Sequence, residues 1–480
     1  GDARFYDISN FSGTYAYNET NYRDFNTEYD YIKNYRGGVA YSFNKNVKPI
    51  EPFKDVGFVK KTRWLRLVRD FNFSLAPKTV AVRNELDRIY GERKIRNLNP
   101  EATVEQAPFV NKSFNWNRNY TLAYDLAKAI KIDFTANNRA LIREFEGERI
   151  ANADEDLSEI EDPEGDGLGG YIVNPVTGQR EYSYDLHRDS LRSSLRNFGL
   201  TTNYNHSTSV SYNVPLNKIP LLDWTSLTAR YTGTYDWQRG PLVEAGVEDT
   251  LGHTVSNGQQ IQLNASLNML SLYNKVPYLR DINRGKSSRS RERTLKSNKK
   301  ENSTISNKEE EEEDKKKREL KLVKGALRVM MSVKSVSGTY TQNRGHTLPG
   351  FGGETQAMGL DLQADRPRQG LYTYGAPGYG FIFGQQENFS ETSSTFAEYA
   401  AEQRWLVRNP NLFNPYLRSY SEAINLRASV QPVRDLRIDL TTNENRATNW
   451  SEYYRFNDTT LTWSEGNTRL ETGNYSASTI

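Results

Sequence analysis

The chain contains no cysteine among its 480 residues. This absence excludes a disulfide framework, a thiol nucleophile and a thiolate metal site. There is also no run of about 18 apolar residues, so the sequence offers no segment that could cross a membrane as a helix. Positive and negative charges nearly balance, and the formal net charge of +3 argues against a nucleic-acid partner.

Hydrophobic residues are scarce as well, at 36% of the chain, which is low for a packed globular enzyme. Aromatic residues are abundant, at 12% of the chain, and tyrosine alone supplies 30 of them. Disordered chains do not carry so many aromatic side chains. A polar average combined with many tyrosines is typical of a β-barrel that is wet inside and apolar outside.

Within the stretch 224–282, apolar and polar residues alternate over two runs, 227–237 and 261–269. A period of two predicts strands with one apolar and one polar face. The alternation continues for the length that a strand tilted across a bilayer needs, about 9–11 residues. The residues expected to face lipid are Leu227, Tyr231, Tyr235, Ile261, Leu263 and Leu267, and those expected to face the lumen are Arg230, Thr232, Gln262 and Asn264.

A single hairpin of this kind would be explained by a soluble β-sandwich. The same pattern recurs along the chain, and this recurrence favours a membrane barrel. Short or helical connections alternate with long polar ones, as short periplasmic turns alternate with long outer loops in outer-membrane barrels. Short helices are expected at 62–71 and 272–282. The sequence therefore predicts an all-β fold, a transmembrane antiparallel β-barrel with about twelve strands in residues 1–480. Besides the two strands of 224–282, strands are expected near 11–17, 39–43, 79–93, 113–125, 131–141, 197–214, 326–342, 419–430, 436–450 and from 469 onward.

Three long connections have distinct compositions. Residues 143–190 are rich in acidic side chains and are predicted to form an extracellular loop. Residues 286–320 are of low complexity with blocks of opposite charge, which predicts a disordered periplasmic loop. Residues 345–417 combine glycine with aromatic side chains and are predicted to be an extracellular insertion, either a cap over the lumen or a segment packed on the rim. The aromatic residues singled out there are Phe351, Tyr372, Tyr374, Tyr379, Phe381 and Phe383.

Two internal repeats support this assignment of sides. Residues 217–223 (NKIPLLD) are echoed by residues 274–281 (NKVPYLRD). Residues 131–140 (KIDFTANNRA) are echoed by residues 437–447 (RIDLTTNENRA). Both copies of each repeat fall on the same predicted side of the membrane.

Signatures of catalysis are absent from the sequence. The four histidines, His187, His206, His253 and His346, are scattered and have no second ligand at metal-binding spacing. Nucleophile-elbow, zinc-protease and phosphate-loop motifs do not occur. A hydrolase that uses a lone serine and histidine, such as Ser207 beside His206, is a minor alternative. We predict no catalytic, cofactor-binding or metal site, no cofactor, and a protein that is not an enzyme.

Several motifs resemble the SprA/Sov translocon family of the type IX secretion system. The longest is the run of residues 203–231 (NYNHSTSVSYNVPLNKIPLLDWTSLTARY). The run of residues 376–384 (APGYGFIFG) also fits, except that tryptophan is expected where Tyr379 stands. The likeness extends over nearly the whole chain outside the acidic loop and residues 286–320. Shorter matches lie at residues 51–53 (EPF), 69–73 (RDFNF), 272–277 (LYNKVP) and 348–351 (LPGF).

The resemblance implies a single-chain barrel far larger than this sequence, of which these strands form an arc. It implies a location in the outer membrane of a Gram-negative bacterium and the passage of folded proteins through it, in support of type IX secretion and gliding motility. The implied partners are outer-membrane lipid, a PorV-type shuttle barrel, a periplasmic plug protein and secreted cargo with a C-terminal signal. The family supplies no catalytic residues.

The chain begins at Gly1 with neither a methionine nor a signal peptide and ends on the strand-like residues 474–480, so we expect an internal fragment. An arc of a larger wall predicts no ladder between residues 9–18 and 470–480, and polar residues on the concave side. Two alternatives remain: a porin or nutrient transporter of ordinary size, closed by these twelve strands, and a surface adhesin built as a soluble β-array.

Overall fold

Most of the chain forms strands, and few helices are present in the computed structural model. The structure describes residues 4–98, 106–144, 149–150, 171–173, 180–182, 184–241, 251–283, 327, 329–363, 370–387, 395–433, 435–465 and 469–480. Within these residues, no helix has both the length and the apolar character needed to cross a membrane.

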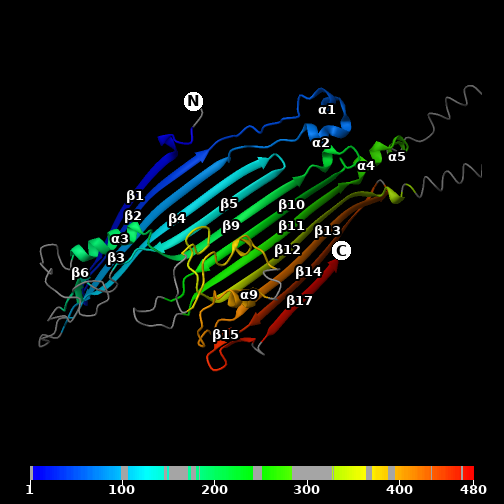
Figure 1. The fold of residues 1–480 in the computed structure, drawn as a ribbon. Coiled ribbons are helices and arrows are strands. Elements are labelled where there is room, and N and C mark those ends of the chain that lie inside the picture. Colours follow the sequence, from blue (N-terminus) through cyan, green and yellow to red (C-terminus); the bar gives the residue numbers. More distant parts are fainter. Residues whose placement is uncertain are drawn as a thin grey trace, which may run out of the picture.

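A single twelve-stranded antiparallel sheet dominates the fold (Figure 1). The predicted strand content and number are confirmed. The strands lie side by side in chain order, so each pairs with its nearest neighbours in the sheet. They are β1 (Phe11–Tyr22), β2 (Thr27–Asn44), β3 (Thr79–Ile95), β4 (Phe109–Ala127), β5 (Ile130–Leu141), β9 (Leu200–Val214), β10 (Thr225–Gln238), β11 (His253–Asn268), β12 (Val333–Phe351), β13 (Tyr416–Val433), β14 (Leu436–Glu452) and β17 (Leu470–Thr479).

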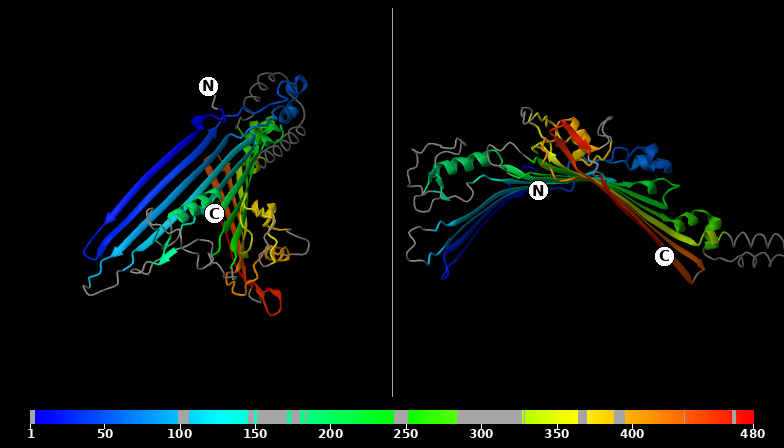
Figure 2. Two further views of the ribbon diagram at one scale, coloured as in Figure 1. Left: turned by 60° about the vertical axis from the view of Figure 1, so that its left-hand side comes forward. Right: turned by 90° about the horizontal axis from the view of Figure 1, so that it is seen from below.

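The sheet is open. Among the described residues, β1 pairs only with β2 and β17 pairs only with β14, and no ladder joins β1 to β17. This is the pairing expected for residues 9–18 and 470–480. Seen from below in the right panel of Figure 2, both edges bend toward the same side, so the sheet has a convex and a concave face.

Strand register decides which side chains share a face. Tyr231 lies opposite Val210 on β9 and Ile261 on β11, and Ile261 lies opposite Gln342 on β12. The neighbouring residue Thr232 is aligned with Ser209 and Gln260 on the other face. Because consecutive residues in a strand point to opposite faces, the alternation seen in the sequence becomes two chemically different surfaces.

One of these surfaces carries a belt of apolar side chains across the strands from β1 to β14, near the end of the sheet where the β4–β5 and β9–β10 turns lie. The belt is on the convex face. Toward the other end of the strands, the segment between β12 and β13 covers this same face (Figure 2). Many of its side chains are exposed. The apolar belt includes Phe11, Tyr41, Val82, Leu122, Ile132, Val210, Leu227, Ile261, Leu263, Tyr340, Leu426 and Leu440.

In the described residues, several connections at the belt end contain short helices. Between β2 and β3 the chain forms α1 (Gly57–Lys61), η2 (Arg63–Leu65) and α2 (Arg66–Arg69), where one helix was predicted. The predicted helical range, 62–71, contains η2 and α2. Extended backbone at Thr62, with φ −98° and ψ 115°, separates them from α1, which lies before that range. A short 3-10 helix, η3 (Leu216–Lys218), follows β9, and another, η1 (Ile8–Asn10), precedes β1.

The second predicted helix is also divided, into α4 (Met269–Lys275) and α5 (Pro277–Asn283). The proline at the first position of α5 explains the break, because a residue before proline avoids the helical region. Val276 accordingly has φ −94° and ψ 112°. The charged segment 286–320 lies outside the described residues.

The opposite end of the sheet carries the tight β1–β2 turn, residues 23–26, and several longer connections. Within the predicted acidic loop the described parts are three short strands, β6 (Arg149–Ile150), β7 (Tyr171–Val173) and β8 (Arg180–Tyr182), and helix α3 (Tyr184–Arg196). Residues 143–144 of that loop are also described, and its remaining residues lie outside the described part of the chain. A small hairpin of β15 (Tyr454–Asn457) and β16 (Thr462–Glu465), which the sequence did not indicate, joins β14 to β17.

The predicted insertion 345–417 begins inside β12 and ends inside β13, so the connecting part is residues 352–415, called here the β12–β13 insertion. It contains α8 (Tyr379–Ile382) and α9 (Phe396–Glu402). The main buried cluster lies between this insertion and the convex face of the sheet. It joins Tyr235, Trp237 and Val255 of the sheet to Phe381 and Phe396 of the insertion.

Candidate functional site

Hydroxyl and amide side chains line much of the concave face, and charged pairs such as Arg36 with Asp87 lie on it as well. The hydroxyl and amide groups form hydrogen bonds from strand to strand. Thr228 Oγ1 donates to Asn213 Oδ1 (2.9 Å), and Thr339 Oγ1 donates to Asn264 Oδ1 (3.0 Å). Further pairs are Gln260 with Asn343, Asn343 with Ser421, and Asn137 with Asn119. Such groups hydrogen-bond equally well to each other and to water, so the face offers a hydrated surface with little apolar area.

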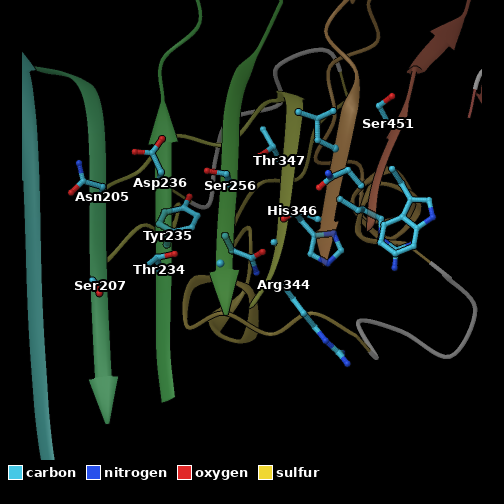
Figure 3. A pocket seen from close by; sticks show the side chains of 18 of the residues that line it. Asn205, Ser207, Thr234, Tyr235, Asp236, Ser256, Arg344, His346, Thr347 and Ser451 are labelled. Atoms are coloured by element: carbon cyan, nitrogen blue, oxygen red, sulfur yellow. The ribbon is translucent and has the colours of Figure 1, made fainter. Parts of the chain in front are cut away.

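A hollow of about 770 Å³ lies on this polar surface, over the strands from β5 to β17. Figure 3 shows Asn205 and Ser207 on β9, Thr234 and Asp236 on β10, and Ser256 on β11 along one side of it. The side chains are small and polar. The lining on the far side includes Thr347, Leu417, Ser419, Asn449, Ser451 and Thr472.

Directly behind the hollow, the β12–β13 insertion is bound to the convex face. Tyr231 Oη donates to the carbonyl of Phe383 (2.6 Å), and Tyr235 Oη donates to that of Gly359 (3.2 Å). Trp237 Nε1 donates to the carbonyl of Gly353 (3.0 Å). These three side chains stand at alternate positions of β10, so one strand supplies a row of donors to the insertion.

Neighbouring strands add to this row. His206 Nε2 on β9 donates to the carbonyl of Ile382 (2.7 Å), and His346 Nε2 on β12 donates to that of Gln386 (3.1 Å). Between them Asn257 Nδ2 on β11 donates to the carbonyls of Phe381 (3.1 Å) and Gln385 (2.9 Å). Side chains from four consecutive strands thus donate to the carbonyls of residues 381, 382, 383, 385 and 386. We call the sheet residues of this row, His206, Tyr231, Tyr235, Trp237, Asn257 and His346, the latch.

Close backbone approach is part of the latch. A Cβ atom placed on Gly233 would lie 2.2 Å from the carbonyl oxygen of Phe383. Glycine is therefore required at this position of β10. Gly37, which shares the same face on β2, has nothing within 4 Å of the corresponding point.

The position of the latch residue Tyr235 contradicts one prediction about the apolar face. Tyr235 was expected to face lipid, but its side chain is only 1% exposed because the insertion covers it. Its neighbours in register are His206 and Asn257, and both are buried polar residues. Polar residues in an otherwise apolar alternation were the available signal that something docks at this end of the strands.

The serine and histidine considered for hydrolysis do not act together. Ser207 lies opposite Thr234 on the concave face, whereas His206 lies opposite Tyr235 on the convex face under the insertion. Two other histidines lie elsewhere. The His253 ring packs against Trp237 at a tilt, with ring centroids 4.7 Å apart, and His187 is on α3. Among the described residues, no group of three His, Asp or Glu side chains is arranged to hold a metal ion.

Of the predicted cap residues, Phe351 and Phe381 belong to the buried cluster on the convex side. Tyr372, Tyr374 and Tyr379 are exposed. The described part of the insertion therefore packs on the face opposite the hollow, and its role as a cap stays a prediction.

Searches with protein-family models and among curated proteins find no match to this chain. Its function is therefore argued from the two faces of the sheet.

Proposed function

We propose that this chain forms part of the wall of a large outer-membrane channel that conducts folded proteins, as the SprA/Sov family does in type IX secretion and gliding motility. The observation that supports this most is the division of one curved, open sheet into an apolar convex face and a hydroxyl- and amide-lined concave face. The convex belt faces lipid and the concave face lines an aqueous passage.

The exposed side chains of the belt support the membrane part of the proposal. Phe11, Val39 and Leu426 are each about half exposed on the convex face. A monomeric soluble protein rarely exposes a contiguous apolar patch of more than a few hundred Å². A soluble adhesin would have to leave the whole belt in water, whereas a barrel in the outer membrane buries it in lipid.

The unpaired edges favour an arc over a closed porin. Unsatisfied N–H and C=O groups cost several kcal/mol each in lipid, so β1 and β17 require further strands beside them. Barrel diameter grows with strand number, and 16–18 strands already leave an aqueous channel. A wall with many more strands makes a passage wide enough for folded cargo.

The concave face suits such a passage because Asn, Ser and Thr side chains bind water and present little apolar surface to a passing protein. Partners follow from the family resemblance: a PorV-type shuttle barrel, a periplasmic plug and cargo with a C-terminal signal. No catalytic step is part of this function.

Site-specific photo-crosslinking in the native outer membrane tests the proposal. A photo-reactive amino acid replaces Gln262 on the concave face, and in a matched variant it replaces Ile261, its neighbour on the convex face. We expect adducts with secreted proteins from position 262 and none from position 261. Equal yields of cargo adducts from both positions, or none from position 262 during active secretion, would overturn the assignment.

A further inference from the structure

The connection between β2 and β3 is an amphipathic element held against the end of the sheet. It is defined here as the rim segment, residues 50–75. Ile50 and Phe73 exchange two backbone hydrogen bonds (2.7 and 3.1 Å), which close the segment into a loop. Figure 1 shows its helices α1 and α2 beyond the strand ends.

Two side chains fix this loop beside the apolar belt. Tyr124 Oη, which shares the convex face with Leu122, donates to the carbonyl of Ser74 (2.6 Å). The backbone N–H of Lys128 donates to Asn72 Oδ1 (2.7 Å). The rim segment is therefore positioned where the belt ends.

Large apolar side chains of the rim segment are exposed. Phe58 is 74% exposed, Trp64 63% and Phe71 50%. Leu67, Val68 and Leu75 are exposed as well. Aromatic residues in this position, next to an apolar belt, are typical of the girdles at membrane–water interfaces.

Beside these apolar side chains lies a cavity of about 460 Å³ with an excess of positive charge. Its lining has five basic and two acidic residues: Lys54, Lys60, Arg69, Lys128 and Lys218, with Glu51 and Asp70. The lining therefore carries a net charge of +3, from five positive and two negative side chains.

The two carboxylates hold the basic groups in place. Glu51 pairs with Lys54 (2.6 Å) and with Lys128, and these hydrogen bonds lower the pKa of Glu51 to about 2. Asp70 pairs with Arg69 (2.9 Å) and lies 3.7 Å from Lys218. Lys128 and Lys218 come from the turns after β4 and β9, so three separate connections contribute to one basic cavity.

We propose that this cavity binds the phosphate of an anionic lipid headgroup, while the exposed aromatic side chains of the rim segment enter the adjoining layer of acyl chains. The inference rests on the proposed function, because it requires the belt to be in a membrane. Basic residues attract anionic headgroups, and an amphipathic element with aromatic side chains lies in the interface plane. An inorganic phosphate ion would use the basic groups but leave the neighbouring apolar surface in water.

The absence of cysteine makes a fluorescence test direct. Phe58→Cys is introduced into the complete barrel that this chain is proposed to belong to and carries an environment-sensitive fluorophore. That barrel is reconstituted in vesicles with brominated phosphatidylglycerol or brominated phosphatidylcholine. We expect quenching by the anionic lipid to exceed quenching by the zwitterionic lipid several-fold. In Lys128→Gln/Lys218→Gln the ratio should fall to near one.

The matched control is Arg427→Gln/Arg437→Gln. It removes the same charge from exposed side chains on β13 and β14, near the same end of the sheet but outside the basic cavity. The lipid preference reported at position 58 should be unchanged in this variant. Loss of the preference in the control as well would show that overall charge, and not the cavity, is responsible.

A second reporter separates failure of the inference from failure of the proposed function. Leu263→Cys places the fluorophore on the apolar belt, where both brominated lipids should quench it. If position 263 is not quenched, the membrane assignment fails. If position 263 is quenched but position 58 shows no headgroup preference, the lipid site alone is wrong. Loss of the preference on adding inorganic phosphate would assign the cavity to that ion.

Discussion

Leu263 and Asn264 are consecutive residues of β11 in opposite environments. Leu263 lies opposite Ala229 and Tyr340 on the convex face and is 37% exposed there. Asn264 points to the concave face, where its side chain accepts a hydrogen bond from Thr339. The environment of a residue in this sheet therefore changes completely over a single step of the chain.

This contrast gives a prediction for Leu263→Arg and Asn264→Arg. A cationic side chain on the lipid face near the midplane should cost about 2–4 kcal/mol, whereas the same change in the lumen should be mild. Assembly in the outer membrane, followed as the fraction of folded protein, measures the difference. Equal tolerance of the two substitutions would contradict the proposed orientation of the faces.

Gly233 provides a second prediction at the scale of one residue. Gly233→Ala forces the Phe383 carbonyl away from β10, and strain of this kind typically costs about 1–3 kcal/mol. The β12–β13 insertion should then detach more often, and limited proteolysis should cleave it faster. Gly37→Ala is the matched control, because that added methyl group meets nothing within 4 Å. Identical cleavage rates in the two variants would show that the close approach at Gly233 does not hold the insertion.

Among the elements, α3 is docked through a buried histidine. The His187 side chain lies 3.7 Å from the Glu144 carboxylate, which also pairs with Arg88 (2.7 Å). Burial, together with the positive charges of Lys112 and Arg88, lowers the pKa of His187 to about 4. The helix is therefore docked with a neutral imidazole at neutral pH.

The docking of α3 should weaken in acid. The unfolded chain protonates this histidine near pH 6.5, whereas the folded chain does so only near pH 4. Between these values the unfolded state binds the additional proton, so stability falls as the pH drops from about 6.5 to about 4. The shift corresponds to roughly 3 kcal/mol at most. Hydrogen exchange of α3 at the two pH values measures the change, and His187→Gln should lose this pH dependence. An unchanged dependence in His187→Gln would assign it to another group.

The two copies of the repeated turn motif connect neighbouring elements of the sheet. The copies at residues 217–223 and 274–281 lie at the same end of the sheet, as their placement in the sequence predicts. Lys275 of the second copy pairs with Asp223 of the first and donates to the carbonyl of Pro220 (2.6 Å). The two turns therefore support each other directly.

For the molecule as a whole, the unpaired edges of β1 and β17 determine whether the chain can insert into a membrane by itself. β1 and β17 each present one side that no described strand pairs with. Residues 1–480 expressed alone should therefore aggregate in detergent or lipid and fail to insert as a folded monomer, because bare strand edges are not tolerated in hydrocarbon. Heat-modifiable migration on a gel measures this. A compact, heat-modifiable monomer would instead support the twelve-strand porin.

The sequence by itself predicts the number of strands, their order and the two faces of the sheet. These features depend on local alternation, and a period of two is visible in residues such as Leu227, Tyr231 and Ile261 without any knowledge of contacts. The absence of cysteine and of catalytic motifs is likewise a property of the sequence alone. The prediction of one helix at 272–282 misses the break at Val276, because it uses only the helical spacing of apolar residues and not the following proline.

The tertiary structure alone decides which parts of the apolar face are covered. Tyr235 and Leu263 have the same pattern in the sequence, yet only Tyr235 lies beneath residues more than 100 positions away in the chain. The basic cavity of the rim segment is a similar case, since Lys54, Lys128 and Lys218 meet only when three turns are brought to one edge. Contacts between distant segments depend on packing, and the period of a strand carries no information about what will pack on it.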